Sequence, residues 1–110
     1  MTAVEALRRA KELLSDPAKW TKGAMARGTW GVSCGVAFVG ADCFCANGAL
    51  LSLYRGTGEC TASGASLWLS AAAQKLGFEN VTAMNDAAGT THADIMALYD
   101  RAILLAEAAQ

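Results

Sequence analysis

The sequence has few charged residues, a single histidine and a single proline among its 110 positions. Charged residues make up 17% of the chain, and the nine basic residues are scattered rather than grouped. The densest cluster is Arg8, Arg9 and Lys11, and acidic residues flank it on both sides. Affinity for nucleic acid depends on clustered basic side chains that release counterions from phosphates. We therefore expect no nucleic-acid partner.

Long hydrophobic runs are also missing. No stretch approaches the roughly 18 apolar residues that a membrane-spanning helix needs, and the first 14 residues carry charges throughout, unlike a signal peptide. We expect a cytoplasmic protein with no membrane partner. In a reducing compartment the four cysteines, Cys34, Cys43, Cys45 and Cys60, are expected to be free thiols.

Apolar residues, in contrast, are abundant. Hydrophobic residues form 54% of the chain, and a chain of this length can bury about two thirds of its unfolded surface around one core. The sequence therefore predicts a single domain over residues 1–110. A surface poor in charge and rich in small residues is typical of a face that another protein covers, so we expect a protein partner or a homo-oligomer.

Helix signals are clear at both ends of the chain. Thr2 with Glu5, and Thr91 with Asp94, have the spacing of capping boxes, in which side chains satisfy the free amides of a helix start. Apolar residues then recur at helical spacing. Two further helices are predicted between them, the first starting at Asp42 and stopping before Gly56, the second stopping at Gly77. The first of the four predicted helices ends near Ser15. The other three span 42–55, 63–76 and 91–106.

Residues 23–40 have a different character. Five glycines interrupt this segment, and the residues from Val32 to Phe38 alternate between larger and smaller side chains, a period typical of strands. A hairpin pairing 24–26 with 30–32 is one interpretation, and an irregular loop is the other. The predicted fold class is mainly α: a compact four-helix single domain with a small glycine-rich extended or β-hairpin insert at about residues 23–40.

Metal and phosphate sites are not expected. Zinc sites use paired cysteines or histidines at close spacing, whereas only one residue separates Cys43 from Cys45 and the other two thiols lie far off. No glycine-rich segment carries the lysine and hydroxyl of a phosphate loop; the Gly56-Thr57-Gly58 segment is interpreted as a turn. We therefore predict no metal and no cofactor.

One enzyme hypothesis has a chemical basis. Cys43 and Cys45 fall in the first turn of the helix predicted to start at Asp42, where the helix dipole favours a thiolate. His92 would serve as the base and Asp86 as the group that orients it, as in thiol hydrolases. The competing interpretation is that the cysteines are buried as small apolar residues.

Four positions are candidate binding residues, and one of them, Asp86, is also the orienting group of the enzyme hypothesis. Asn85 and Asp86 are expected to form a turn, because their short side chains bond to nearby backbone, and such a pair can also face a ligand. Trp20 and Trp30 flank the glycine-rich insert. Either they pin it to the helices, or they form an exposed aromatic anchor of the kind that dominates protein interfaces.

Three short motifs occur in a fixed order along the chain. They are Trp20-Thr21-Lys22-Gly23, the run from Cys45 to Leu50 (CANGAL), and Asn85-Asp86 followed by a threonine and the closing helix THADIMAL. In this order the sequence resembles a family of small uncharacterised proteins of bacteria and their phages, although Met84 stands where that pattern has a tryptophan. The resemblance implies no activity and no catalytic residues, and is compatible with a phage or prophage origin.

Two functions follow as hypotheses. The first is a small cytoplasmic protein-interaction module, with phage or prophage ancestry. The alternative is a cysteine-dependent hydrolase or transferase that uses a Cys–His pair, with Cys45 or Cys43 as nucleophile and His92 as base.

Overall fold

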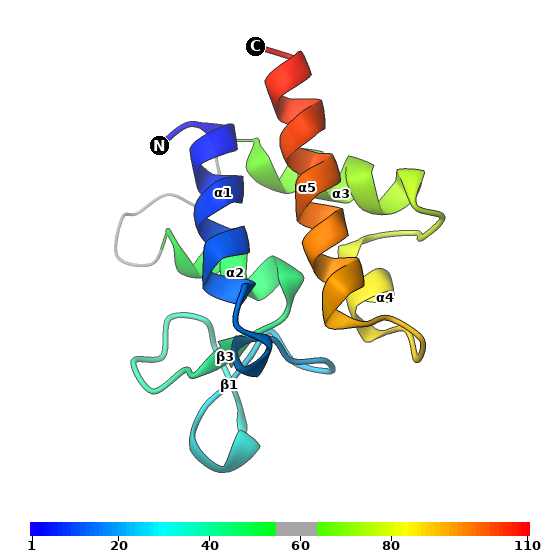
Figure 1. Cartoon of the computed structure of the whole chain (residues 1–110). Coiled ribbons are helices and arrows are strands. Elements are labelled where there is room, and N and C mark those ends of the chain that lie inside the picture. Colours follow the sequence, from blue (N-terminus) through cyan, green and yellow to red (C-terminus); the bar gives the residue numbers. More distant parts are fainter. Residues whose placement is uncertain (55–63) are drawn as a thin grey trace.

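The computed structural model describes residues 1–54 and 64–110, and in these ranges the chain is mainly helical with a small antiparallel sheet (Figure 1). The helices are α1 (Ala3–Leu14), α2 (Ala46–Ser52), α3 (Ala65–Lys75), α4 (Val81–Asp86) and α5 (His92–Ala108), with short 3-10 turns η1 (Pro17–Lys19) and η2 (Thr29–Gly31). The strands are β1 (Ala26–Arg27), β2 (Ser33–Cys34) and β3 (Cys43–Phe44). The described part therefore has five α-helices, one more than predicted.

The helices enclose one hydrophobic core. In Figure 1, α1 and α5 lie side by side, with α2 and α3 crossing behind them and the strands at the end remote from both termini. The largest fully buried hydrophobic side chains come from four of the helices, namely Leu7, Leu14, Leu50, Leu69, Ile95, Leu98 and Tyr99. None of the helices in the described ranges is long and apolar enough to cross a membrane.

The predicted caps at both ends of the chain are present. The Thr2 hydroxyl accepts a hydrogen bond from the Glu5 amide at the start of α1, and Thr91 with Asp94 forms the reciprocal capping box of α5. Gly77 adopts a left-handed φ of 95° just after α3, a conformation that costs glycine little. Local sequence signals were therefore sufficient to define α1, α5 and the end of α3.

The predicted helix over 42–55 is wrong at its start. Cys43 and Phe44 form β3, Cys45 is the N-cap, and α2 begins only at Ala46. Asp42 caps nothing; its amide donates to the Arg27 carbonyl at 2.8 Å. Pairing with β1 satisfies the backbone of residues 43–44 and overrides their helical pattern. The predicted stop at Gly56, the turn that follows it and Cys60 lie outside the described residues.

Residues 78–89, which lie between the helices predicted over 63–76 and 91–106, contain α4. Asn80 starts this helix by accepting a hydrogen bond from the Ala83 amide at 2.8 Å, which is ordinary N-cap chemistry. Asn85 and Asp86 are its last two residues, so the prediction of a simple turn there was wrong. A helix of six residues is too short to reveal itself by periodicity.

The insert forms a hairpin, in a different register from the predicted one. β1 pairs with β2 as Ala26 to Cys34 and Arg27 to Ser33, and on its other edge with β3. The predicted pairing of 24–26 with 30–32 is wrong in register, because residues 29–31 form the turn η2 instead. The sheet order is β2-β1-β3, which fastens the insert to the residues that lead into α2.

Candidate functional site

Asn85 lies at the centre of a polar network that joins three separate segments. Its side chain is fully buried, and its Oδ1 accepts hydrogen bonds from the Trp20 indole at 2.7 Å and from the Ala46 amide at 3.0 Å. Its amide nitrogen donates to the Thr21 carbonyl at 3.0 Å and to Asp86 Oδ1 at 2.9 Å. All the hydrogen-bonding capacity that a buried amide must satisfy is used inside the protein.

Asp86 extends this network to the glycine-rich insert. Its Oδ1 also accepts from the Gly23 amide at 2.9 Å. The Gly23 amide, assisted by the Asn85 side chain, lowers the pKa of the Asp86 carboxyl below its ordinary value, because both donors favour the charged form. Nearby, Lys22 Nζ donates to the Ala87 carbonyl at 2.6 Å, so Lys22 and the first residue of the insert are both bonded to the end of α4.

Cys45 is an N-cap residue in a buried position. Its sulfur accepts a hydrogen bond from the Gly48 amide at 3.2 Å and lies 3.6 Å from the Met25 sulfur. Burial raises the pKa of the Cys45 thiol, and this outweighs the lowering by the helix amides. The helix start alone would favour a thiolate, but here desolvation has the larger effect.

Gly48 allows the insert to pack directly against α2. A Cβ at this position would lie 2.0 Å from the Met25 carbonyl oxygen, a separation that no side chain can occupy. The Cys45 amide donates to the same carbonyl at 3.1 Å. The helix and the loop thus touch through backbone atoms, which is why this mid-helix position carries a glycine.

His92, the first residue of α5, contacts Trp20 and the end of α1. One ring nitrogen, Nε2, lies 2.6 Å from the Leu14 carbonyl oxygen, and the imidazole packs against the Trp20 indole with ring centres 6.2 Å apart and planes tilted by 56°. Neither contact involves a thiol. The Cys45 sulfur contacts Met25 and Gly48, and the sulfur of the half-buried Cys43 lies 3.9 Å from the Arg27 carbonyl.

Two residues that the sequence analysis missed complete the network. The Tyr99 hydroxyl, fully buried on α5, donates to the Ala46 carbonyl at 2.6 Å, and burial raises its pKa. Arg27 donates to the Thr21 hydroxyl at 3.0 Å and to the Lys22 carbonyl at 2.9 Å. A tyrosine on a predicted buried face is a usable signal, since its hydroxyl requires a partner.

A small hollow lies over the network. It has a volume of about 190 Å³ and is lined by Asp86, Cys45, Thr82 and three residues of the insert, Gly23, Ala24 and Met25. Its size suits a few water molecules rather than a drug-sized ligand, for which pockets start at roughly 300 Å³. In the described part of the chain, no three His, Cys, Asp or Glu side chains group to hold a metal ion.

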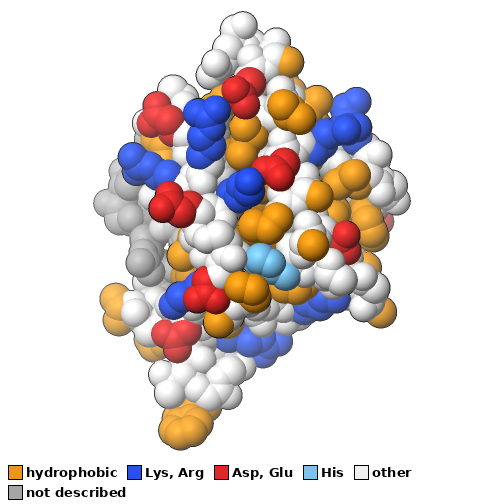
Figure 2. All heavy atoms as spheres, in the orientation of Figure 1, with side chains coloured by type: hydrophobic (Ala, Val, Ile, Leu, Met, Phe, Trp, Pro, Cys, Tyr) orange, Lys and Arg blue, Asp and Glu red, His pale blue; other side chains and the backbone are white. Residues whose placement is uncertain are grey.

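Trp30, unlike Trp20, points away from the protein. Its side chain is 94% exposed, and its backbone adopts a left-handed φ of 66° that non-glycine residues avoid. Arg27 holds the turn by donating from Nη1 to the Gly31 carbonyl at 3.0 Å. Figure 2 shows hydrophobic side chains at the tip of the molecule formed by this loop, away from the charged side chains over α1 and α5.

The motifs noted in the sequence therefore meet in space. Trp20 and Gly23 come from the first, Cys45 and Gly48 from the second, and Asn85 with Asp86 from the third; the hydrogen bonds above connect all three. A family model described as a family of unknown function, DUF6197, matches residues 1–105. The chain belongs to this family. No curated protein and no solved structure matches it.

In this chain the hydrogen bonds among the three motifs attach the insert to the helices. The buried donors and acceptors of the network satisfy one another. Burial raises the pKa of the Cys45 thiol and keeps it neutral, and its sulfur caps the start of α2. Among the described large apolar residues, the two with the greatest exposed fractions, Trp30 at 94% and Val39 at 95%, lie in the loops of the insert.

Proposed function

We propose that this member of DUF6197 is a cytoplasmic protein-interaction module that binds its partner through the loops around Trp30. The observation that carries the proposal is the side chain of Trp30, which is 94% exposed on a backbone with a left-handed φ. Exposed aromatic side chains supply much of the energy of protein interfaces. A strained conformation for a bulky residue is found where function, rather than stability, requires it.

The second loop adds to the same surface. Residues 35–42 lead from β2 to β3, and in this loop Val39 is 95% exposed and Phe38 is also exposed. The two loops touch, because a Cβ on Gly28 would lie 3.0 Å from the Gly40 carbonyl oxygen. We call Trp30, Val32, Phe38 and Val39 the tip surface. Exposed apolar residues on two loops that touch at their bases mark a candidate interaction site.

The chemistry of the tip surface favours an apolar groove on a protein. Residues 28–41 contain no charged side chain, so a partner cannot be recognised there by ion pairs. An anionic membrane would instead be attracted by basic residues, which this segment lacks. The partner is therefore expected to offer a hydrophobic pocket that accepts the Trp30 indole. Polar groups around that pocket would form hydrogen bonds with the polar atoms of Gly31 and Ser33.

The underlying network supports this use of the loops. Arg27, Asp42 and Gly28 fix the two loops to each other and to the sheet, and the Asn85 network fixes the sheet to the helices. A tip surface held rigidly loses little conformational entropy on binding. The resemblance to bacterial and phage proteins is compatible with a partner in a bacterial host, and a phage or prophage origin forms part of this proposal.

Affinity capture with matched variants tests the proposal. Immobilised wild-type protein, Trp30→Ala and Leu104→Ala are incubated with lysate of the native host, since Leu104 is exposed but lies on α5 outside the tip surface. A specific protein retained by wild type and Leu104→Ala, and lost with Trp30→Ala, is the expected result. Equal recovery of that protein by wild type and both variants contradicts the proposal. Sedimentation of wild type with neutral lipid vesicles, in place of a protein partner, also contradicts it.

A further inference from the structure

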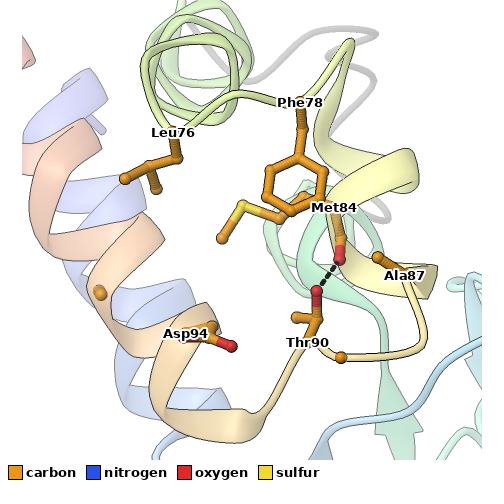
Figure 3. Close-up of a pocket in the computed structure, with 8 residues that line it drawn as sticks. Leu76, Phe78, Met84, Ala87, Thr90 and Asp94 are labelled. Carbon is orange, nitrogen blue, oxygen red and sulfur yellow. Dashed lines mark hydrogen bonds between the residues drawn. The ribbon is translucent and has the colours of Figure 1, made fainter.

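An apolar pocket lies between α3, α4 and α5, on a part of the molecule that neither the Asn85 network nor the tip surface uses (Figure 3). Its volume is about 360 Å³, within the range of roughly 300–1,000 Å³ typical of small-molecule sites. Apolar side chains form most of its wall, principally Leu76, Phe78, Met84 and Ala97. Figure 3 shows Leu76, Phe78 and Met84 converging on the space from two sides.

Two polar side chains line the same pocket, and both can only accept hydrogen bonds from a ligand. The Thr90 hydroxyl has a single proton, which it donates to the Met84 carbonyl at 2.6 Å, so only its oxygen lone pairs remain. Asp94 is an acceptor through both oxygens. Its Oδ2 accepts from the Thr91 amide at 2.8 Å, and no donor to Oδ1 is found among the described residues.

The side-chain charge among the described residues that line the pocket is negative. Asp94 is the charged residue among those that line it, and no described lining residue is basic. A carboxylate at the edge of an apolar wall attracts a cation and repels an anion.

We propose that this pocket binds a small organic cation: an amine with an apolar body, whose ammonium group is held by Asp94 and the Thr90 oxygen. The apolar body packs against Phe78, Met84 and Leu76. A primary alkylamine is protonated at neutral pH, as lysine is, and its three N–H donors match the acceptors of the pocket. This pocket shares no residue with the tip surface, so the two proposals are tested independently.

The probe is 2-phenylethylamine, and its comparison compounds are the neutral 2-phenylethanol and the anionic 3-phenylpropanoate. Binding to the 110-residue protein is followed by two-dimensional amide NMR at neutral pH. We expect saturable binding of the amine with a Kd on the order of 0.1–1 mM, a reasonable affinity for so small a ligand. The alcohol should bind roughly tenfold more weakly because it lacks the charge-assisted hydrogen bond, and the anion should not bind.

Two variants locate the site, each with a control. Asp94→Asn keeps an oxygen that can accept from the Thr91 amide, and should abolish the preference for the amine over the alcohol. Asp100→Asn removes the same charge from α5 at a position that pairs with Lys11, and should preserve that preference. Ala97→Phe should fill the pocket and prevent binding of both probes, whereas Ala108→Phe, at an exposed position farther along α5, should not.

Three results would overturn the proposal. No saturable binding of the amine at about ten times the expected Kd means that the pocket takes no such ligand. Equal affinity for amine and alcohol means that Asp94 does not select a cation. Unchanged amine binding by a folded Ala97→Phe variant places the ligand elsewhere on the protein.

Discussion

The indole nitrogen of Trp20 donates a 2.7 Å hydrogen bond to Oδ1 of Asn85, a side chain 65 positions away in the sequence. The same oxygen accepts from the amide of Ala46, the first residue of α2. One buried amide thus connects the segment after α1, the start of α2 and the end of α4. No apolar side chain could replace it, because each of those segments would be left with an unpaired polar group.

Replacing Asn85 should therefore be costly. In Asn85→Ala the Trp20 indole, the Ala46 amide and the Thr21 carbonyl lose their partners together, and each buried unsatisfied group costs about 1–3 kcal/mol. We expect the free energy of unfolding in urea to fall by about 3 kcal/mol or more. Asn47→Ala, which removes only a 3.4 Å contact with Thr82, should cost under about 1 kcal/mol. Similar losses for the two variants would contradict the central role of Asn85.

Gly48→Ala should destabilise the protein although it improves helix propensity. Alanine in a helix interior is ordinarily favoured over glycine by about 1 kcal/mol. Here the added Cβ would lie 2.0 Å from the Met25 carbonyl oxygen, so α2 and the insert must separate, at a cost of about 2 kcal/mol or more. Gly35→Ala is the control, because nothing lies within 4 Å of its Cβ position. Thermal unfolding of both variants shows whether each substitution raises or lowers the stability.

The parts of this fold that could be predicted from sequence depend on local signals. Thr2, Thr91 and Gly77 act on their own helix ends, and the apolar stripes of α1 and α5 need no knowledge of the rest of the chain. The start of α2 could not be predicted, since Cys43 and Phe44 leave their helical pattern only because β1 is available to pair with them. Strand pairing of this kind is set by distant residues.

The site shows the same division. Trp20, Asn85 and Asp86 were singled out by residue type and by motif order, but only the fold shows that they bond to one another. Tyr99 and Arg27 were missed because they look like an ordinary core tyrosine and an ordinary surface arginine in the sequence. The different environments of Trp20 and Trp30 also depend on tertiary structure, since Trp20 lies just before the insert and Trp30 lies within it.

Asp86 should contribute a pH-dependent part of the stability. Its pKa is lowered in the native state by the Gly23 amide and the Asn85 side chain. Because the native pKa lies below the unfolded value, the ionised carboxylate stabilises the fold above about pH 4, and this contribution is lost as the pH falls through the native pKa. Asp86→Asn retains an acceptor for Gly23 and should show a shallower loss of stability below about pH 4.

The measurement is urea unfolding of wild type and Asp86→Asn at a series of pH values between neutral and acid. Carbon-detected NMR titration of the Asp86 carboxyl gives the native pKa directly. Parallel stability curves for the two proteins over the acid range would show that the hydrogen bond from Gly23 does not favour the charged carboxylate.

Cys45 should be the least reactive of the described thiols. Burial raises its pKa and leaves only 4% of the residue exposed, and alkylation requires an accessible thiolate. In peptide mapping after iodoacetamide treatment at neutral pH, we expect Cys45 to react only when the protein unfolds, and Cys34 and Cys43 to react sooner because they are half-buried.

His92→Ala provides the decisive comparison for the cysteine-enzyme hypothesis. The imidazole contacts the Leu14 carbonyl and the Trp20 ring, so its removal should leave the alkylation rate of Cys45 in the folded protein unchanged. Rapid alkylation of Cys45 in wild type that slows in His92→Ala would instead favour a thiol nucleophile with a histidine base.

Trp30 should prove dispensable for stability and necessary for binding. A left-handed backbone costs a non-glycine residue roughly 1–2 kcal/mol, and the exposed indole recovers almost none of this by burial. Trp30→Gly removes that strain, and the larger entropy of glycine in the unfolded chain offsets about half of the gain. We expect the free energy of unfolding to stay equal or rise by up to about 1 kcal/mol, measured in urea.

Trp20→Phe is the contrasting variant, because it removes the indole donor to Asn85 while keeping an aromatic ring, and it should lower the free energy of unfolding by about 1–3 kcal/mol. If Trp30→Gly instead lost stability to a similar extent, Trp30 would have a packing role and its exposure would not indicate a partner. A Trp30→Gly protein that is as stable as wild type and no longer retains the captured protein would separate the two roles. In that case the strain at Trp30 is maintained for recognition, since folding gains nothing from it.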